Sequence, residues 1–92
     1  MKIETIRRED HERIPKTLEE GILYVSERFR IAIHLCACGC GGETVTPLAD
    51  DASGWQLTGD VNPTLSPSIG NWAGKQPYHA HYFIRNGKVV PA

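Results

Sequence analysis

Apolar and polar positions alternate over short stretches of the chain, and this two-residue period is typical of β-strands. In "RIAIHLC" (residues 30–36) the isoleucines and the leucine share one face of a strand, whereas Ala32, His34 and Cys36 share the other. Further strands are predicted at "ILYVS", "ETVTPL" and "GWQLTG". "HYFIRNGKVV" (81–90) predicts two strands joined by a tight turn, because Asn86-Gly87 suits a two-residue hairpin loop.

These segments predict a mainly β fold: a small, zinc-ribbon-like single domain of roughly five to seven short strands with little helix. Long loops are expected at 36–42, 49–54 and 62–78, the last because Pro63, Pro67 and Gly70 interrupt it. Residues 1–17 are expected to form a charged N-terminal arm or short element, since the first 30 residues carry 14 of the 21 charged side chains. Residues 18–92 then form the single β domain.

With 92 residues, the chain is long enough for one domain, whose core is marginal without a disulfide, a metal or a partner. The formal net charge of −1 gives no electrostatic reason to expect binding to nucleic acid or to an anionic membrane. No apolar run approaches the roughly 18–20 residues of a membrane span, and the N-terminal stretch lacks the apolar segment of a signal peptide. We therefore expect a cytoplasmic protein with reduced thiols, and its oligomeric state stays open.

All three cysteines lie within "HLCACGCGG" (34–42), at alternate positions followed by glycines. An odd number of thiols does not suit a disulfide framework, and the glycines allow the backbone to turn so that the sulfurs converge on one ion. Zinc prefers thiolate and imidazole ligands in a tetrahedral shell. We therefore predict a metal site at Cys36, Cys38 and Cys40, with small buried apolar residues as the alternative.

The fourth ligand is open among His34, His79 and His81. The last two are spaced two residues apart on a predicted strand, so both face the same side. A metal held between them and the cysteines would join two distant parts of the chain and supply stability that the small core lacks. His34 is more typical of a strand histidine with a hydrogen-bond partner.

The stretch "LSPSIGNW" (65–72) places Ser66 and Ser68 around a proline, followed by Asn71. A serine nucleophile needs a fixed hydroxyl, a base within hydrogen-bond reach and donors aimed at the oxyanion. His81 or His79 is the candidate base, and the backbone after the second serine, or the Asn71 amide, is the candidate donor. The alternative is an ordered turn whose serines cap backbone groups, because the stretch is not a G-x-S-x-G elbow.

Taken in order, "GILYVSERFRIAIHLCACGCGGETVTPL", "LSPSIGNW" and "HYFIRNGKVV" resemble a small bacterial family, the BubE-like family, long labelled as a domain of unknown function. Its pattern is roughly H-x-C-x-C-G-C-G, then L-x-P-S-I-G-N-W, then C-x-S-H-Y-x-I-x-x-G-x-V. The resemblance covers about residues 18–90. Members occur in operons that encode ubiquitin-like conjugation machinery. The resemblance therefore implies a serine peptidase that processes a bacterial ubiquitin-like protein at its C-terminal tail or removes it from conjugates.

The resemblance also implies roles for individual residues. The positions that match the family's motifs are Cys36, Cys38 and Cys40 for a zinc-stabilised site, and Ser66, Ser68, Gly70, Asn71 and His81 for the serine loop and its histidine. On this carry-over Ser68 is the best candidate nucleophile and His81 the best candidate general base.

Two positions depart from the family pattern. Tyr78 stands where the family has a cysteine, and His79, one position along, is the expected replacement as a zinc ligand. Ala80 stands where the family has a serine. If that serine is the family's nucleophile, this chain is an inactive form. If Ser68 or Ser66 is the nucleophile, Ala80 removes only a support.

Three functions follow from these observations. The first is a zinc-stabilised serine peptidase or isopeptidase acting on a bacterial ubiquitin-like protein. The second is a non-catalytic zinc-binding protein-interaction module, which Ala80 favours. The third is a metal hydrolase in which zinc keeps an open position and Glu43 activates water. We expect the first, with a structural metal, and nothing selects the third member of a triad among Asp50, Asp51 and Asp60.

Overall fold

The computed structural model describes residues 1–71 and 80–92, which form strands and turns without a helix. This part of the chain accordingly offers no helix that could cross a membrane. The expected mainly β fold is confirmed, with eight strands in the described residues rather than five to seven. They are β1 (Arg7–Asp10), β2 (Ile22–Ser26), β3 (Ile31–Leu35), β4 (Glu43–Pro47), β5 (Gln56–Thr58), β6 (Thr64–Asn71), β7 (Ala80–Arg85) and β8 (Lys88–Pro91).

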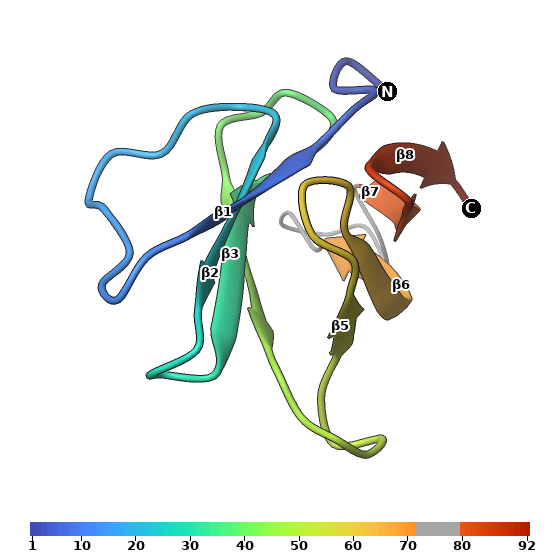
Figure 1. Cartoon of the computed structure of the whole chain (residues 1–92). Helices are drawn as coiled ribbons and strands as arrows, with labels where there is room; N and C mark the ends of the chain where they lie inside the picture. Colours follow the sequence, from blue (N-terminus) through green and yellow to red (C-terminus); the bar gives the residue numbers. More distant parts are fainter. Residues whose placement is uncertain (72–79) are drawn as a thin grey trace.

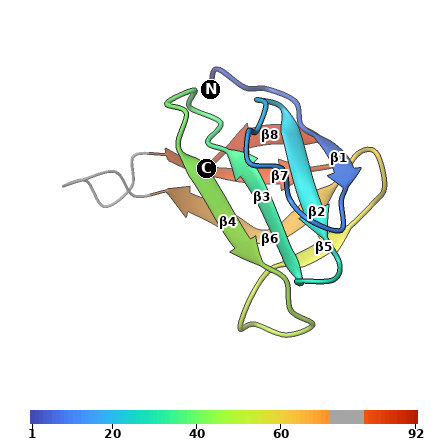
Figure 2. The same ribbon diagram turned by 90° about the vertical axis from the view of Figure 1, so that its left-hand side faces the viewer.

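The strands form two four-stranded sheets that pack around one core (Figures 1 and 2). One sheet has the order β1-β2-β3-β4 and the other the order β5-β6-β7-β8. Neighbouring strands are antiparallel except β1 and β2, which are parallel. Isolated bridges join the edges of the two sheets, Thr5 with Lys88 on one side and Leu48 with Trp55 on the other.

The core forms because alternate side chains of the central strands point between the sheets. Leu23 and Val25 of β2 belong to the same buried cluster as Leu65 of β6 and Ile84 of β7. These strands lie far apart in the sequence, so the cluster exists only once both sheets have formed. Burial of such side chains is the main favourable term in the folding of a domain this small.

The predicted alternation in β3 and the predicted hairpin are both confirmed. In β3 the buried positions are Ala32 and His34, and the isoleucines and leucine are half-buried. The β7–β8 hairpin turns at Asn86 and Gly87, whose φ angles of 49° and 75° lie in the left-handed region. Asparagine and glycine tolerate this region, which explains why the dipeptide signals a two-residue turn.

The N-terminal segment is part of the first sheet: of the two forms expected for residues 1–17, an arm or a short element, residues 7–10 form a short element, the strand β1. β1 pairs with β2 with Arg7 opposite Ile22. Ile3 and Ile6, just before β1, are 7% and 2% exposed. Two isoleucines among many charges give little local signal, and their burial against the core decides the structure.

The loop predicted over 62–78 is wrong for residues 64–71, which form β6, the longest of the described strands, whereas residues 72–78 lie outside the described residues. The strand lies between β5 and β7 and contains a register shift between Leu65 and Ile69, with a cis peptide bond at Ser66–Pro67. Proline and glycine are tolerated in a strand at an irregularity of this kind. Pairing with β5 and β7 and the burial of Leu65 and Ile69 therefore override the local sequence signals for a loop.

The burial of β6 gives a stability prediction. Leu65 is 1% exposed, whereas Val61, three residues before β6, is 59% exposed. We expect Leu65→Ala to lower the free energy of unfolding by about 2–5 kcal/mol, because it removes buried methyl groups and leaves a cavity. The control Val61→Ala should change it by about 0.5 kcal/mol or less. Urea denaturation measures both, and equal effects would contradict the placement of Leu65 in the core.

Candidate active site and metal site

The structure brings Ser68 and His81 into direct contact. Ser68 Oγ lies 2.9 Å from His81 Nε2. The two residues come from neighbouring strands, in which Gly70 of β6 is opposite His81 of β7. Because Gly70 carries no side chain, the imidazole can extend across this position toward the serine two residues away. A hydroxyl within hydrogen-bond reach of an imidazole nitrogen is the arrangement that serine nucleophiles require.

Ala80 does not share the face on which this pair lies. In β7 the buried residues are Ala80, Tyr82 and Ile84, whereas His81 and Phe83 are half-buried. Ala80 is 5% exposed and belongs to the core cluster. Since successive side chains of a strand point to opposite faces, a serine at position 80 would point away from His81. Position 80 is therefore poorly placed for a nucleophile that uses this histidine as its base.

An aromatic ring lies beside His81 on the outer face of β7, and an arginine lies over that ring. The ring centroid of Phe83 lies 6.4 Å from that of His81, and the guanidinium of Arg85 lies 4.0 Å from the centroid of the Phe83 ring. The backbone is also held, because the N–H of Ala92 donates to the carbonyl of His81 at 3.0 Å. The histidine is thus positioned by its strand, by the C-terminal residue and by a ring on the same face.

The other candidates of the serine loop have different partners. Ser66 is exposed and is opposite Gln56 of β5. The Asn71 amide donates to the hydroxyl of Tyr82 at 3.3 Å, so it is directed at a core residue. The backbone N–H groups that follow Ser68 consequently remain as candidate oxyanion donors.

The acidic candidates for a third triad member lie in loops and bind other groups. Asp50 pairs with Arg30 at 3.4 Å. Asp51 accepts a hydrogen bond from the Ser53 backbone N–H at 2.9 Å. Asp60 is exposed in the turn between β5 and β6. None of these contacts points to a role beside His81.

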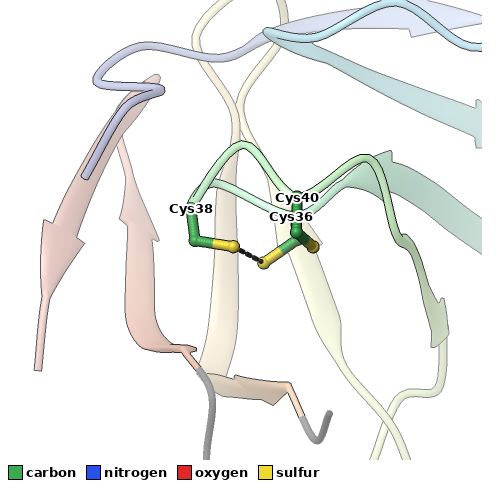
Figure 3. A group of neighbouring side chains, drawn as sticks. All are labelled: Cys36, Cys38 and Cys40. Carbon is green, nitrogen blue, oxygen red and sulfur yellow. Dashed lines mark hydrogen bonds between the residues drawn. The ribbon is translucent and has the colours of Figure 1, made fainter.

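The three cysteines form a compact cluster in the loop between β3 and β4 (Figure 3). The loop is closed by its backbone, since the N–H of Cys36 donates to the carbonyl of Gly42 at 2.8 Å. Gly39 and Gly41 have φ angles of 87° and 82°. Side chains other than glycine rarely adopt this left-handed conformation, so the glycines allow the turn that brings the thiols together.

The geometry of the thiols fits a tetrahedral metal. The sulfur atoms of Cys36, Cys38 and Cys40 all lie within 4.8 Å of one another, and the first two are 3.3 Å apart. Zinc–sulfur bonds of about 2.3 Å place the sulfurs of a tetrahedral site about 3.8 Å apart. Among the described residues, His34 and His81 are not part of this group. His79, the predicted fourth ligand, lies outside the described residues.

The protonation of the thiols links this cluster to metal binding. Loss of hydration, together with hydrogen bonds to the neighbouring thiols, raises the pKa of Cys38 to about 11. The Gly42 N–H, whose nitrogen lies 3.4 Å from Cys40 Sγ, lowers the pKa of that thiol. Because metal ligands are thiolates, binding of a metal would release protons from this cluster.

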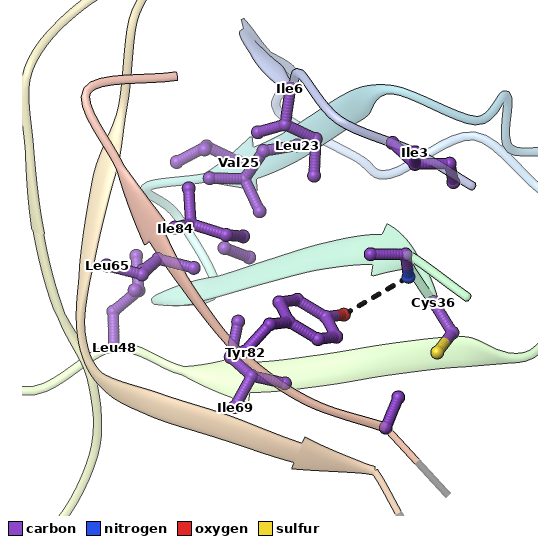
Figure 4. Packing of buried hydrophobic residues seen from close by; sticks show 13 residues of the cluster. Ile3, Ile6, Leu23, Val25, Cys36, Leu48, Leu65, Ile69, Tyr82 and Ile84 are labelled. Carbon is purple, nitrogen blue, oxygen red and sulfur yellow. Dashed lines mark hydrogen bonds between the residues drawn. The ribbon is translucent and has the colours of Figure 1, made fainter. Parts of the chain in front are cut away.

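Tyr82 connects the cysteine loop to the strands of the serine–histidine pair (Figure 4). Its hydroxyl is 2.6 Å from His34 Nε2 and accepts a hydrogen bond from the Ala37 N–H at 3.4 Å. Burial lowers the pKa of His34 to about 4, so this imidazole is neutral at pH 7. The expected role of His34 as a strand histidine with a hydrogen-bond partner is thereby confirmed.

The sequence pattern did not single out Tyr82, although one signal was present. The residue follows His81 and alternates with Ala80 and Ile84, which places it on the inward face. A tyrosine at such a position requires a buried partner for its hydroxyl. That partner, His34, lies 48 positions away in the sequence, so only the tertiary structure identifies it.

Removal of this hydroxyl should destabilise the protein. We expect Tyr82→Phe to lower the free energy of unfolding by about 1–3 kcal/mol, because buried partners such as the imidazole of His34 lose a hydrogen bond. The control is Tyr24→Phe. Tyr24 is also buried, but its hydroxyl accepts a bond from the Glu19 N–H in a half-exposed segment, and about 1 kcal/mol is expected. Urea denaturation compares the two, and an equal or smaller loss in Tyr82→Phe would contradict the bridging role.

Comparison with known protein families identifies the family of this chain. Residues 10–92 match the family model described as bacterial ubiquitination-like system serine protease (BubE). The chain belongs to the BubE family. No curated protein and no solved structure matches it.

Membership in the BubE family confirms the resemblance inferred from the three motifs. The match starts at residue 10, so it includes β2 to β8 and every described candidate residue of both sites. The family is named as a serine protease of a bacterial ubiquitination-like system. This description agrees with a site in which a serine and a histidine are in contact, and with three cysteines that could hold a metal.

Proposed function

We propose that this protein is a zinc-stabilised serine peptidase or isopeptidase that processes or deconjugates a bacterial ubiquitin-like protein at its C-terminal tail. Ser68 is the nucleophile and His81 is the general base. The observation that carries the proposal is the distance of 2.9 Å between Ser68 Oγ and His81 Nε2 on the outer face of one sheet. The family's name supports the reaction class.

The reaction follows the order that such a pair permits. His81 Nε2 takes the proton of Ser68 Oγ while the oxygen attacks the scissile carbonyl carbon. The protonated imidazole then gives this proton to the leaving amine as the carbon–nitrogen bond breaks, leaving an acyl-enzyme. Water, deprotonated by His81, then attacks the ester carbon, and the protonated imidazole returns the proton to Ser68 Oγ as the carbon–oxygen bond breaks and the acid product is released. Backbone N–H groups after Ser68 are the proposed donors to the negatively charged oxygen in both steps.

Zinc has a structural role in this proposal. Cys36, Cys38 and Cys40 supply three thiolates, and His79 is the proposed fourth ligand. A closed shell of four protein ligands stabilises a small domain and leaves no position for water. The Tyr82 hydroxyl accepts a hydrogen bond from the Ala37 N–H, between two of the ligands, so a metal bound here would fix a loop that is tied to the core.

Active-site labelling tests the proposal directly. A fluorophosphonate reacts with an activated serine, so it should modify this protein at Ser68, as located by mass spectrometry of its peptides. Replacement of the base in His81→Ala should abolish labelling, while Ser53→Ala, in the loop before β5, should label normally. Cleavage of a ubiquitin-like fusion protein should be lost in parallel with labelling. A folded, zinc-loaded protein that is neither labelled nor able to cleave would instead be a zinc-binding interaction module.

A further inference from the structure

Among the described residues, the second half of β6 has an open edge. β5 pairs only with Thr64, Leu65 and Ser66 of this strand. Residues 69–71 of β6 pair with β7 on one side, residues 67 and 68 lie in the register shift, and no described strand pairs with the other side of residues 67–71. None of the described backbone hydrogen bonds outside the sheets involves residues 67–71.

The edge is open because the chain before β5 turns away from β6. Trp55 lies next to the first residue of β5, and its backbone bonds instead to the last residue of β4 and to the segment that follows β4. Its N–H donates to the carbonyl of Pro47 at 2.8 Å, and its carbonyl accepts from the Ala49 N–H at 3.0 Å. The place beside residues 67–71 that a longer β5 would occupy is therefore left without a strand from the described part of the chain.

An edge of this kind can bind another polypeptide. Residues 68–71 contain no proline, so each keeps its backbone N–H, and alternate residues of a strand direct their N–H and C=O groups to the same edge. Unpaired backbone groups of an edge strand form hydrogen bonds with an added strand whatever its side chains are. Gly70 has no side chain that could obstruct an approaching peptide on either face.

We propose that the edge of residues 67–71, here called the β6 edge, binds the C-terminal tail of the ubiquitin-like substrate as an added β-strand. This inference rests on the proposed function, because Ser68 lies within the β6 edge. The scissile carbonyl must come to about 3–3.5 Å from Ser68 Oγ before attack. A strand added to β6 lies about 4.8 Å from it, so the tail reaches the nucleophile while it pairs with the backbone.

The β4 edge is the competing surface. β4 is also the last strand of its sheet, and no described strand pairs with its outer side, although the Pro47 carbonyl at its end accepts a hydrogen bond from the Trp55 N–H. It carries none of the residues of the serine–histidine pair, and it ends at Pro47, which lacks an N–H. Binding there would not by itself place a peptide bond at Ser68 Oγ. The observations therefore favour the β6 edge.

Substitution of the substrate backbone tests the inference. The probe is a short fluorogenic peptide with the tail sequence of a bacterial ubiquitin-like protein, prepared with one N-methylated residue at each position in turn. Because N-methylation removes a donor, kcat/KM should fall at least about tenfold at alternate positions and little at those between them. The peptides methylated at the positions in between serve as the matched control. Cleavage that is insensitive to N-methylation at every position would overturn the inference and leave the proposed function intact.

A binding measurement tests the β6 edge separately from the proposed function, because it does not require turnover. In Ser68→Ala, saturation with the same peptide should slow amide hydrogen exchange of Ile69, Gly70 or Asn71, as measured by NMR. The amides of β4 report the competing edge in the same experiment. Protection at the β6 edge supports the inference even if the wild-type protein fails to cleave, which would defeat only the proposed function. Protection confined to β4 would overturn the inference.

Discussion

Ser68→Ala is expected to abolish cleavage of a ubiquitin-like fusion protein, with a loss of at least about 1,000-fold in kcat/KM. The substitution removes the only atom that the proposal places in covalent contact with the substrate. The fold should persist, because Ser68 is half-buried on the outer face of β6 and its described hydrogen bond is the one to His81. Steady-state cleavage measures the first expectation, and thermal unfolding measures the second.

The choice of controls makes this experiment decisive between the serine positions. Ser66→Ala should retain cleavage, because Ser66 is exposed and opposite Gln56 of β5. If Ser66→Ala and not Ser68→Ala is inactive, the nucleophile is Ser66 and the contact of 2.9 Å has another role. Ala80→Ser should not be required for cleavage, since position 80 is in the core. Cleavage that appears only in Ala80→Ser would mark the natural chain as an inactive form.

Removal of the metal is expected to cause a large loss of stability. The purified protein should contain one zinc per chain, and a strong chelator should lower the free energy of unfolding by at least about 3 kcal/mol. For a domain of this size the corresponding decrease in Tm is roughly 12–24 °C. The reason is that the cysteine loop is part of the core: Cys36 is 1% exposed, and the Ala37 carbonyl accepts a bond from the Ile3 N–H at 2.9 Å.

The metal experiment has its own controls. Re-addition of zinc should restore Tm, and Cys40→Ser should reproduce the effect of the chelator, because it removes an exposed ligand without disturbing the core. Thermal unfolding followed by circular dichroism measures all three. Purified protein without metal, or a Tm that the chelator leaves unchanged, would contradict a structural zinc site. Loss of cleavage with an unchanged Tm would instead support the metal hydrolase.

The strands with a regular local pattern could be predicted, and the irregular ones could not. β2, β3 and the β7–β8 hairpin have apolar runs, alternation or a turn dipeptide that acts within a few residues. β1 is a strand because two isoleucines beside it are buried by distant residues, and β6 is a strand because β5 and β7 pair with it. Neither cause is contained in the local sequence, which carries charges in one case and prolines in the other.

The two candidate sites also differ in how far the local sequence predicts them. The cysteine cluster is local, so the spacing of three thiols, with glycines between and after them, is sufficient to predict it. The serine–histidine contact joins residues 13 positions apart. The sequence offers two serines and two histidines for this role without deciding among them. The register of β6 and β7 selects one described pair, because residues of opposite strands meet only in one alignment.

The sequence by itself therefore determined the family, the β class and the chemical character of both sites, since these depend on residue types and short spacings. The tertiary structure decided which serine meets His81, that position 80 faces the core, and that half of β6 has an edge that no other described strand covers. The physical reason is that side-chain direction alternates along a strand and pairing register is set by the packing of the whole core. A change of one residue in that register would bring a different set of side chains to the same surface.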